Sequence, residues 1–295
     1  MSGSVAGKNG LRSSRLGANG ATLYLVEAGA ADAPLVVLLH GFPEFWFAWR
    51  HQIAPVAAAG FHVIAPDLRG YGQSEKPPGV AAYDLDVVAG DILALAERFG
   101  RKRFSVVGHD WGASVGWWLA QRHPERIERL VALNAPHPAV WRQAMRRHPE
   151  QRRKSRYVGM FRLPALPELL LRLNDYDGLV KALRSARRQD AFSDEDIARY
   201  RAAWRQPGAL TAMINWYRAL LRKDMRGADA IRITVPTTLI WGVDDAYGAR
   251  DLAGLSIALC DRGRVVFLDN ATHWVQHDEP ERVTALILEA LAAPI

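Results

Sequence analysis

The sequence predicts an α/β fold, a mostly parallel sheet with helices on both faces. Short apolar strand patterns alternate with helical patterns in residues 21–134 and again from residue 233, which is typical of strand–helix–strand units. Between these parts the apolar residues have only helical spacing. We therefore expect one α/β domain, with core halves at 1–137 and 233–295 and a helical cap at 138–232.

The strands are predicted from runs of apolar and β-branched residues. The run at 34–41 is continuous, which suits a parallel strand buried on both faces. The periodicity of the apolar residues and the flanking turn residues predict the other elements: strands at 21–29, 61–67, 103–108, 128–134, 233–242 and 264–269, and helices at 83–99 and 279–292.

Composition excludes several classes of protein. Hydrophobic residues make up 49% and charged residues 23% of the chain, as in a globular protein with a sizeable core. The net charge is +7, but the arginine-rich stretch 146–156 carries no nucleic-acid motif, so we expect a solvated surface there and no nucleic-acid partner. The single cysteine, Cys260, excludes an internal disulfide, and we expect it to be buried.

No stretch of the sequence predicts contact with a membrane. There is no uninterrupted apolar segment of 18 residues, and the N-terminal residues lack the apolar region of a signal peptide. We therefore expect a cytoplasmic protein without a membrane partner. The oligomeric state is left open, with a homodimer as one option.

The stretch VVGHDWGASVGWW, residues 106–118, has the pattern of a nucleophile elbow between a strand and a helix. A serine usually occupies the third position of this motif, whereas here it is Asp110. A carboxylate with an ordinary pKa near 3.9 is ionised at pH 7, so it needs no base to become a nucleophile. The alternative is that Asp110 is a solvated loop residue or a helix N-cap.

Two further polar residues follow later strands. Asp245 lies in WGVDD and His273 in DNATHW. Because carboxyl ends of parallel strands meet at one edge of a sheet, we expect both near Asp110. The order nucleophile, acid, histidine is that of the α/β-hydrolases. Asp244 and His277 are the competing candidates, whereas Asp67 is expected to hold its own loop in place.

Four motifs then identify a group within that superfamily: HGFP (40–43), DLRGYGQSEKP (67–77), GHDWGA (108–113) and the LNAPHP segment around Asn134. They resemble the α/β-hydrolases that include epoxide hydrolases and haloalkane dehalogenases, over residues 20–290. The resemblance implies the α/β-hydrolase fold with a helical cap after the sixth strand, and no cofactor or metal. It also favours Asp245 over Asp244. We expect His40 and His109 to be hydrogen-bonded scaffold residues.

The cap sequence separates the members of this group. SRYVGMFRLPALPE and INWYRALL resemble the segments in which epoxide hydrolases carry two ring-opening tyrosines, which would be Tyr157 and Tyr217. A phenol with a pKa of about 10 keeps its proton at pH 7 and can donate it to an alkoxide. Simple packing in the cap is the alternative role.

Two differences from the sequences of dehalogenases argue against dehalogenation. Haloalkane dehalogenases commonly have an asparagine where this chain has Phe42, and fluoroacetate dehalogenases have arginines where it has Trp111 and Ser114. A haloalkane or haloacid dehalogenase with the same nucleophile is therefore the second hypothesis. A non-catalytic receptor on the same scaffold is the third, although the complete set of Asp110, Asp245 and His273 argues against it.

The resemblance implies a two-step hydrolysis of a small apolar epoxide. Asp110 would attack a ring carbon while the two tyrosines hold the oxygen, giving a covalent ester. His273, oriented by Asp245, would then activate water. The expected oxyanion donors are the backbone N–H groups of Phe42 and Trp111. The product would be a vicinal diol.

Overall fold

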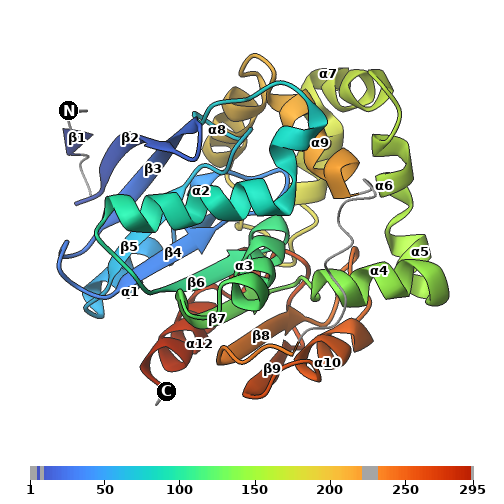
Figure 1. Ribbon diagram of the computed structural model, residues 1–295. Helices are drawn as coiled ribbons and strands as arrows, with labels where there is room; N and C mark the ends of the chain where they lie inside the picture. The colour runs from blue at the N-terminus through green and yellow to red at the C-terminus, as the bar shows by residue number, and fades with distance from the viewer. Residues whose placement is uncertain (1–4, 7–9, 221–231, 294–295) are drawn as a thin grey trace.

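A mostly parallel sheet lies at the centre of the structure, with helices on both faces (Figure 1). The computed structural model describes residues 5–6, 10–220 and 232–293. Within these residues the strand order is β1-β2-β3-β5-β4-β6-β7-β8-β9. The bounds of the strands are β1 Val5–Ala6, β2 Arg12–Ala18, β3 Ala21–Ala28, β4 Leu35–Leu39, β5 His62–Pro66, β6 Phe104–His109, β7 Ile127–Leu133, β8 Thr237–Gly242 and β9 Gly263–Leu268.

The pairing directions follow the sequence patterns. The strands from β5 through β4, β6, β7 and β8 to β9 are parallel, whereas the pairs β1–β2, β2–β3 and β3–β5 are antiparallel. Strands β1 and β2 were not predicted, because β2 is polar and largely half-buried and therefore lacks a continuous apolar run. The predicted start of β8 at Ile233 was wrong. Pro236 has no N–H to donate, and Ile233 forms only an isolated bridge with Cys260.

Alternate residues of the central strands point to opposite faces. Val36 and Leu38 of β4 belong to an apolar cluster with helices α1 (Ile53–Ala58) and α12 (Pro280–Ala292). Val37 and Leu39 belong to a second cluster, which contains residues of α2 (Leu85–Arg98), α3 (Trp111–Arg122) and α10 (Asp251–Ile257). The remaining short helices of the core are η1 Trp46–Trp49, η2 Val80–Tyr83 and α11 Val275–Asp278. The sheet is therefore covered on both sides, which fixes its carboxyl edge as the place for a site.

Among the described residues between β7 and β8, six helices form the segment here called the cap helices. They are α4 Pro138–Arg147, α5 Pro149–Lys154, α6 Arg156–Phe161, α7 Leu166–Leu183, α8 Asp194–Trp204 and α9 Ala209–Leu220. They follow the seventh strand when the two-residue β1 is counted, and the sixth when counting starts at β2. Residues 221–231, the last part of the predicted cap interval, lie outside the described residues.

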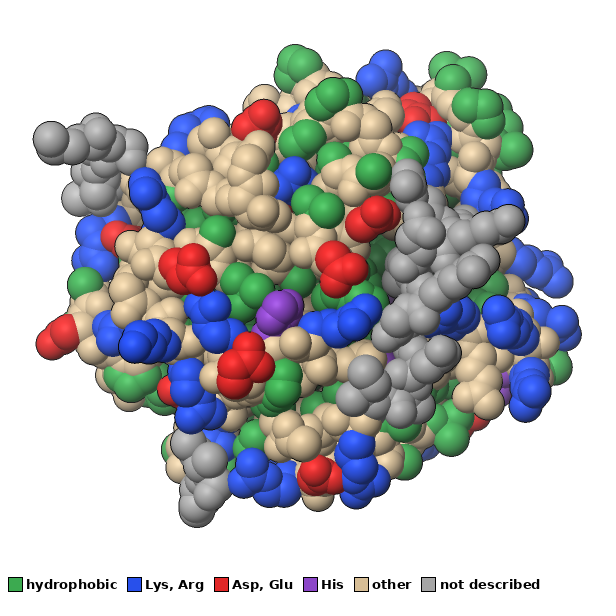
Figure 2. Space-filling view, viewed as in Figure 1, with side chains coloured by type: hydrophobic (Ala, Val, Ile, Leu, Met, Phe, Trp, Pro, Cys, Tyr) green, Lys and Arg blue, Asp and Glu red, His purple; other side chains and the backbone are tan. Residues whose placement is uncertain are grey.

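Three expectations from composition can be compared with the structure. Cys260 is buried, and burial raises the pKa of its thiol to about 11. The arginines of the stretch 146–156 are exposed, and Figure 2 shows lysine and arginine side chains distributed over the face in view, interspersed with acidic ones. Among the described helices, none combines the length and the apolar character needed to cross a membrane.

Candidate active site

The turn between β6 and α3 holds Asp110 in a strained conformation. Its backbone has φ 51° and ψ −116°, a region that non-glycine residues rarely adopt. The turn requires small neighbours, since a Cβ at Gly112 would lie 2.1 Å from the carbonyl oxygen of Leu39. The Asp110 side chain makes no N-cap hydrogen bond to α3. Instead, the sharp turn projects the carboxylate beyond the carboxyl edge of the sheet.

Both oxygens of the Asp110 carboxylate have a defined neighbour. The backbone N–H of Phe42 donates to Oδ1 at 2.8 Å, and Nε2 of His273 lies 3.6 Å from Oδ2. Gly41 packs so closely that a Cβ there would lie 2.4 Å from Cβ of Asp110. Trp111 is the first residue of α3, so its N–H has no acceptor within the helix. The structure thus places the backbones of Phe42 and Trp111 next to Asp110.

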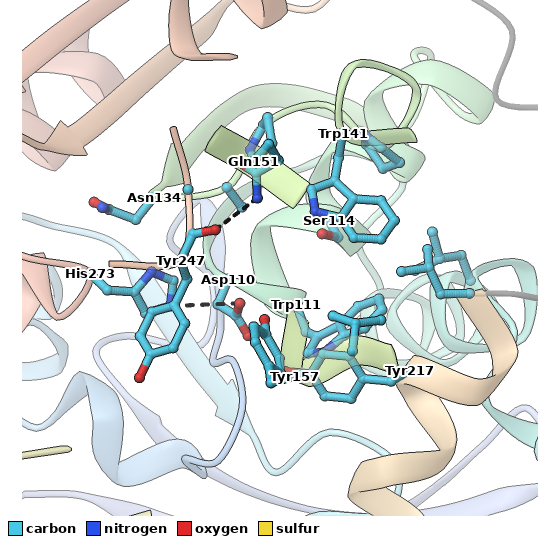
Figure 3. A pocket seen from close by; sticks show the side chains of 17 residues that line it. Asp110, Trp111, Ser114, Asn134, Trp141, Gln151, Tyr157, Tyr217, Tyr247 and His273 are labelled. Carbon is cyan, nitrogen blue, oxygen red and sulfur yellow. Dashed lines mark hydrogen bonds and ion pairs between the residues drawn. The ribbon is translucent and has the colours of Figure 1, made fainter. Parts of the chain in front are cut away.

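His273 lies between two carboxylates, as Figure 3 shows for Asp110. Its Nδ1 is 3.0 Å from Oδ2 of Asp245. Because a carboxylate can only accept, Nδ1 carries a proton, and whenever the ring is neutral the lone pair of Nε2 faces Asp110. Burial alone would lower the pKa of His273, but the charge of Asp245, with smaller contributions from Asp110 and Glu44, raises it above 6.5. The raised pKa makes His273 a stronger proton acceptor than an ordinary histidine.

Asp245 is fully buried and held by several donors. The N–H groups of Tyr247 and Gly248 donate to its Oδ1 at 2.6 and 2.9 Å, and the amide of Asn134 donates to Oδ2 at 2.7 Å. Burial would raise its pKa, yet His273 and these hydrogen bonds lower the pKa below its ordinary value. Asp245 therefore remains charged and fixes the orientation of the imidazole.

The competing acidic and histidine candidates lie elsewhere. Asp244 is exposed and pairs with Arg187 on the surface. His277 is buried, and its Nε2 lies 2.7 Å from Oε1 of Glu44 rather than near Asp110. The structure therefore places neither in contact with the Asp110 carboxylate.

Three other polar residues form hydrogen bonds that hold the scaffold, as expected. Asp67 accepts the backbone N–H groups of Trp46 and Gln73 at 2.9 and 2.7 Å, which fixes its loop. Burial raises the pKa of Asp67 to about 6. His40 accepts the N–H of Leu68 at 2.9 Å. His109 contacts the site indirectly, since its Nε2 lies 2.8 Å from the backbone oxygen of His273.

Tyr157 of α6 and Tyr217 of α9 come from the cap helices and lie next to each other on one side of Asp110 (Figure 3). Their ring centroids are 5.8 Å apart, and the Tyr217 ring lies 5.1 Å from that of Trp111. Burial, together with the negative charge of Asp110, raises the pKa of Tyr157 above its ordinary value. The pKa of Tyr217 is also raised, chiefly by burial. Both phenols are protonated donors at neutral pH.

Two cavities meet at five residues: Asp110, Tyr157, Tyr217, Tyr247 and His273. The smaller, of about 80 Å³, continues between core and cap and is lined by residues that include Trp111, Ser114, Asn134, Trp141 and Gln151. The larger, of about 200 Å³, is walled mainly by apolar side chains: Phe42, Pro43, Met160, Phe161, Leu171, Leu179, Ala182 and Trp274. An apolar molecule can therefore place its reactive group at Asp110 with substituents on either side.

Sequence reasoning missed three residues that support the site. Asn134 directly follows β7, has φ 46°, and its Oδ1 accepts the N–H of Gly242 at 3.0 Å. Glu44, directly after HGFP, accepts from the Tyr200 hydroxyl at 2.7 Å in a buried network behind His273. Tyr247 comes two residues after Asp245. Only for Asn134 was there a usable signal, a polar residue at the carboxyl end of a buried strand.

No metal site is evident in the part of the chain that the structure describes. Residues 5–6, 10–220 and 232–293 contain no group of three or more histidine, cysteine or acidic side chains placed to hold a metal ion.

Comparison with known proteins identifies the family. A model of the alpha/beta hydrolase fold matches residues 34–280. The AB hydrolase superfamily protein YfhM of Bacillus subtilis (strain 168) is 47% identical over 283 residues, covering 96% of this chain and 99% of the relative. Epoxide hydrolase 4 of Mus musculus is 35% identical over 284 residues, covering 92% and 77%.

The fold is also similar to a solved epoxide hydrolase. A mutant of the Bacillus megaterium enzyme, complexed with its product, a naphthyloxy-propane-1,2-diol, has a TM-score of 0.85 and 29% identity, covering 95% of this chain and 100% of the other. The similarity therefore includes the core and the cap helices together. The chain belongs to the α/β-hydrolase family, in the group that contains the epoxide hydrolases.

Proposed function

We propose that the protein hydrolyses epoxides to vicinal diols through a covalent ester on Asp110. The observation that carries this proposal is that the Asp110 carboxylate and two protonated phenols, Tyr157 and Tyr217, line the same two cavities. A nucleophile facing two donors suits a substrate whose leaving oxygen stays in the pocket. Relatives named epoxide hydrolases, one of them with a bound diol, support this reaction.

The first step is displacement at a ring carbon. Oδ1 of Asp110 is held by the Phe42 N–H at 2.8 Å, which leaves Oδ2 to form the bond to carbon. As this bond forms, the ring C–O bond breaks and its electron pair goes to oxygen. Tyr157 and Tyr217 stabilise that oxygen, and one of them gives it a proton. Positioned proton donation of this kind contributes about 10²–10⁴-fold in rate.

The second step is hydrolysis of the ester. His273 takes a proton from water through Nε2, and the resulting hydroxide adds to the carboxyl carbon of Asp110. The negative charge then develops on Oδ1, which already accepts the N–H of Phe42 and can also accept that of Trp111. Cleavage of the bond between the carboxyl carbon and Oδ2 releases the diol and restores a carboxylate. The proton on His273 returns to the tyrosinate, so the net reaction consumes one water.

The surroundings favour small, largely apolar substrates. The larger cavity offers few polar groups other than those of the reaction, and its volume of about 200 Å³ suits an aryl or short alkyl substituent. The mechanism needs no cofactor, because the nucleophile, acid and base are side chains. The cytoplasmic location and the homodimer stay predictions.

One assay tests the function. Purified protein is given a panel of terminal epoxides and a panel of haloalkanes and haloacids, and diol and halide are measured together. We expect diol from the epoxides and no halide. Halide release without diol would contradict the proposal and restore the dehalogenase hypothesis.

A further inference from the structure

Tyr247 is a third tyrosine of the pocket, and the proposed reaction does not use it. It lies in the loop after β8, two residues beyond Asp245. Its side chain is half-buried, and burial raises the pKa of its phenol to about 12. At neutral pH the hydroxyl therefore carries its proton and can act as a hydrogen-bond donor.

Tyr247 lines both cavities, and its ring lies next to residues of the larger, apolar one. It stands edge-on to the His273 ring, with centroids 4.8 Å apart, and lies 6.4 Å from the ring of Trp274. Trp274 lines the larger cavity and not the smaller one. The backbone carbonyl of Tyr247 accepts a hydrogen bond at 2.8 Å from Gln151, which lines the smaller cavity. In Figure 3 the hydroxyl end points away from Asp110, so it does not face the nucleophile.

The hydroxyl of Tyr247 has no hydrogen-bond acceptor among residues 5–6, 10–220 and 232–293. Two buried tyrosines do have one: the Tyr200 hydroxyl donates to Glu44 and that of Tyr83 to the carbonyl of Pro77, each at 2.7 Å, whereas the hydroxyl of buried Tyr71 has no partner among the described residues. The indole N–H of Trp274, in the same wall, donates to the carbonyl of Ala182 at 2.7 Å. Polar groups in such pockets commonly serve to orient a ligand.

We propose that Tyr247 determines substrate specificity by donating a hydrogen bond to an oxygen in the substituent of the epoxide. The inference rests on the proposed function. It names the favoured substrate class as epoxides whose apolar substituent contains an ether or ester oxygen, such as glycidyl ethers and esters. Epoxides with an all-carbon substituent of the same length bind without this contact.

Matched substrate pairs test this role. Phenyl glycidyl ether is compared with 4-phenyl-1,2-epoxybutane, in which a methylene replaces the ether oxygen. Glycidyl butyrate is compared with 1,2-epoxyoctane, in which methylenes replace both the ester oxygen and the carbonyl group. The quantity measured is the ratio of kcat/KM within each pair, for the native protein, for Tyr247→Phe and for the control Tyr24→Phe on strand β3. Because the ratio compares two substrates on one protein, a general change in activity cancels.

We expect the native protein to prefer the oxygen-containing member of at least one pair by about three- to tenfold, the size of one neutral hydrogen bond. Tyr247→Phe should bring that ratio close to one, and Tyr24→Phe should leave it unchanged. Ratios that are the same in Tyr247→Phe and the native protein for both pairs would overturn the role of Tyr247 while leaving the hydrolase function intact. Absence of diol from all four epoxides would instead overturn the proposed function, and the inference with it.

Discussion

The backbone N–H of Phe42 donates to Oδ1 of Asp110 at 2.8 Å, although the two residues are 68 positions apart in the sequence. This contact gives the two carboxylate oxygens different roles before any substrate binds. Oδ1 lies where an oxyanion would form, and Oδ2, 3.6 Å from Nε2 of His273, is left to attack the substrate. The parallel pairing of β4 with β6 produces the contact, because both strands end at the same edge of the sheet.

Gly41→Ala tests the importance of this contact. A Cβ at position 41 would lie 2.4 Å from Cβ of Asp110, so the carboxylate and the Phe42 N–H must move apart. We expect kcat to fall by about 10²–10³-fold, the effect of losing one oxyanion donor. The control is Gly17→Ala, where an added Cβ meets no atom within 4 Å. Steady-state kinetics and thermal unfolding of both variants separate a catalytic loss from unfolding. Wild-type kcat in a folded Gly41→Ala protein would contradict the assignment.

His273→Gln should separate the two steps. Asp110 needs no base, so it should still form the ester, whereas hydrolysis loses its proton acceptor and slows by about 10²–10⁴-fold. Intact-protein and peptide mass spectrometry should then detect the added mass of one epoxide on the Asp110 peptide. The surface variant His123→Gln should accumulate no adduct. An adduct on another peptide, or none while turnover is lost, would count against this division of roles.

The two cap tyrosines should act in ring opening and not in ester hydrolysis. Replacing either Tyr157 or Tyr217 with phenylalanine removes one donor, and we expect the rate of ester formation to fall about 10²-fold or more. The double variant should open epoxides at no measurable rate. Rapid-quench measurement of ester formation reports this step directly, with Tyr24→Phe as the matched control. Normal ester formation in the double variant would show that the two residues only pack.

The pH dependence of ester hydrolysis should report the pKa of His273. That pKa should differ between the free protein and the ester intermediate. The pKa of His273 is raised, so the imidazole stays protonated to a higher pH and ester hydrolysis should slow as the pH falls through that value. The charge of Asp110 contributes to the shift and is lost in the ester. The acid limb of ester hydrolysis should therefore lie below the pKa of His273 in the free protein.

Two measurements compare these values: single-turnover decay of the ester against pH, and NMR titration of His273 in the free protein. An acid limb at or above the free-protein value would contradict the electrostatic account. On the alkaline side, Tyr157 and Tyr217 have pKa values above 10. Ring opening should therefore not decline between pH 7 and 9.

The sequence was sufficient for the fold because the central strands are apolar runs between glycine-rich turns. Local motifs also predicted Asp110, Asp245 and His273 as candidate site residues, since each follows a strand of a parallel sheet. Strand β2 could not be predicted, because its pairing with β3 stabilises a polar segment without an apolar period.

Contacts between segments that are far apart in the chain could not be predicted from the sequence. Asn134 and Asp245 are 111 positions apart, and no local pattern states that the amide reaches the carboxylate. Glu44 and His277 are 233 positions apart and form a buried pair. Tyr247 was overlooked for the same reason, because its place beside His273 depends on how the loop after β8 packs against the cap helices.

The covalent ester on Asp110 is the central claim, and isotope transfer in a single turnover tests it most directly. With protein in excess over epoxide in H₂¹⁸O, the oxygen added to the diol should come from the Asp110 carboxylate. A covalent ester predicts a first-turnover diol without ¹⁸O and an Asp110 peptide heavier by about 2 Da, because water attacks the carboxyl carbon. A diol that contains ¹⁸O after one turnover, with an unlabelled Asp110 peptide, would show direct attack by water and contradict the account.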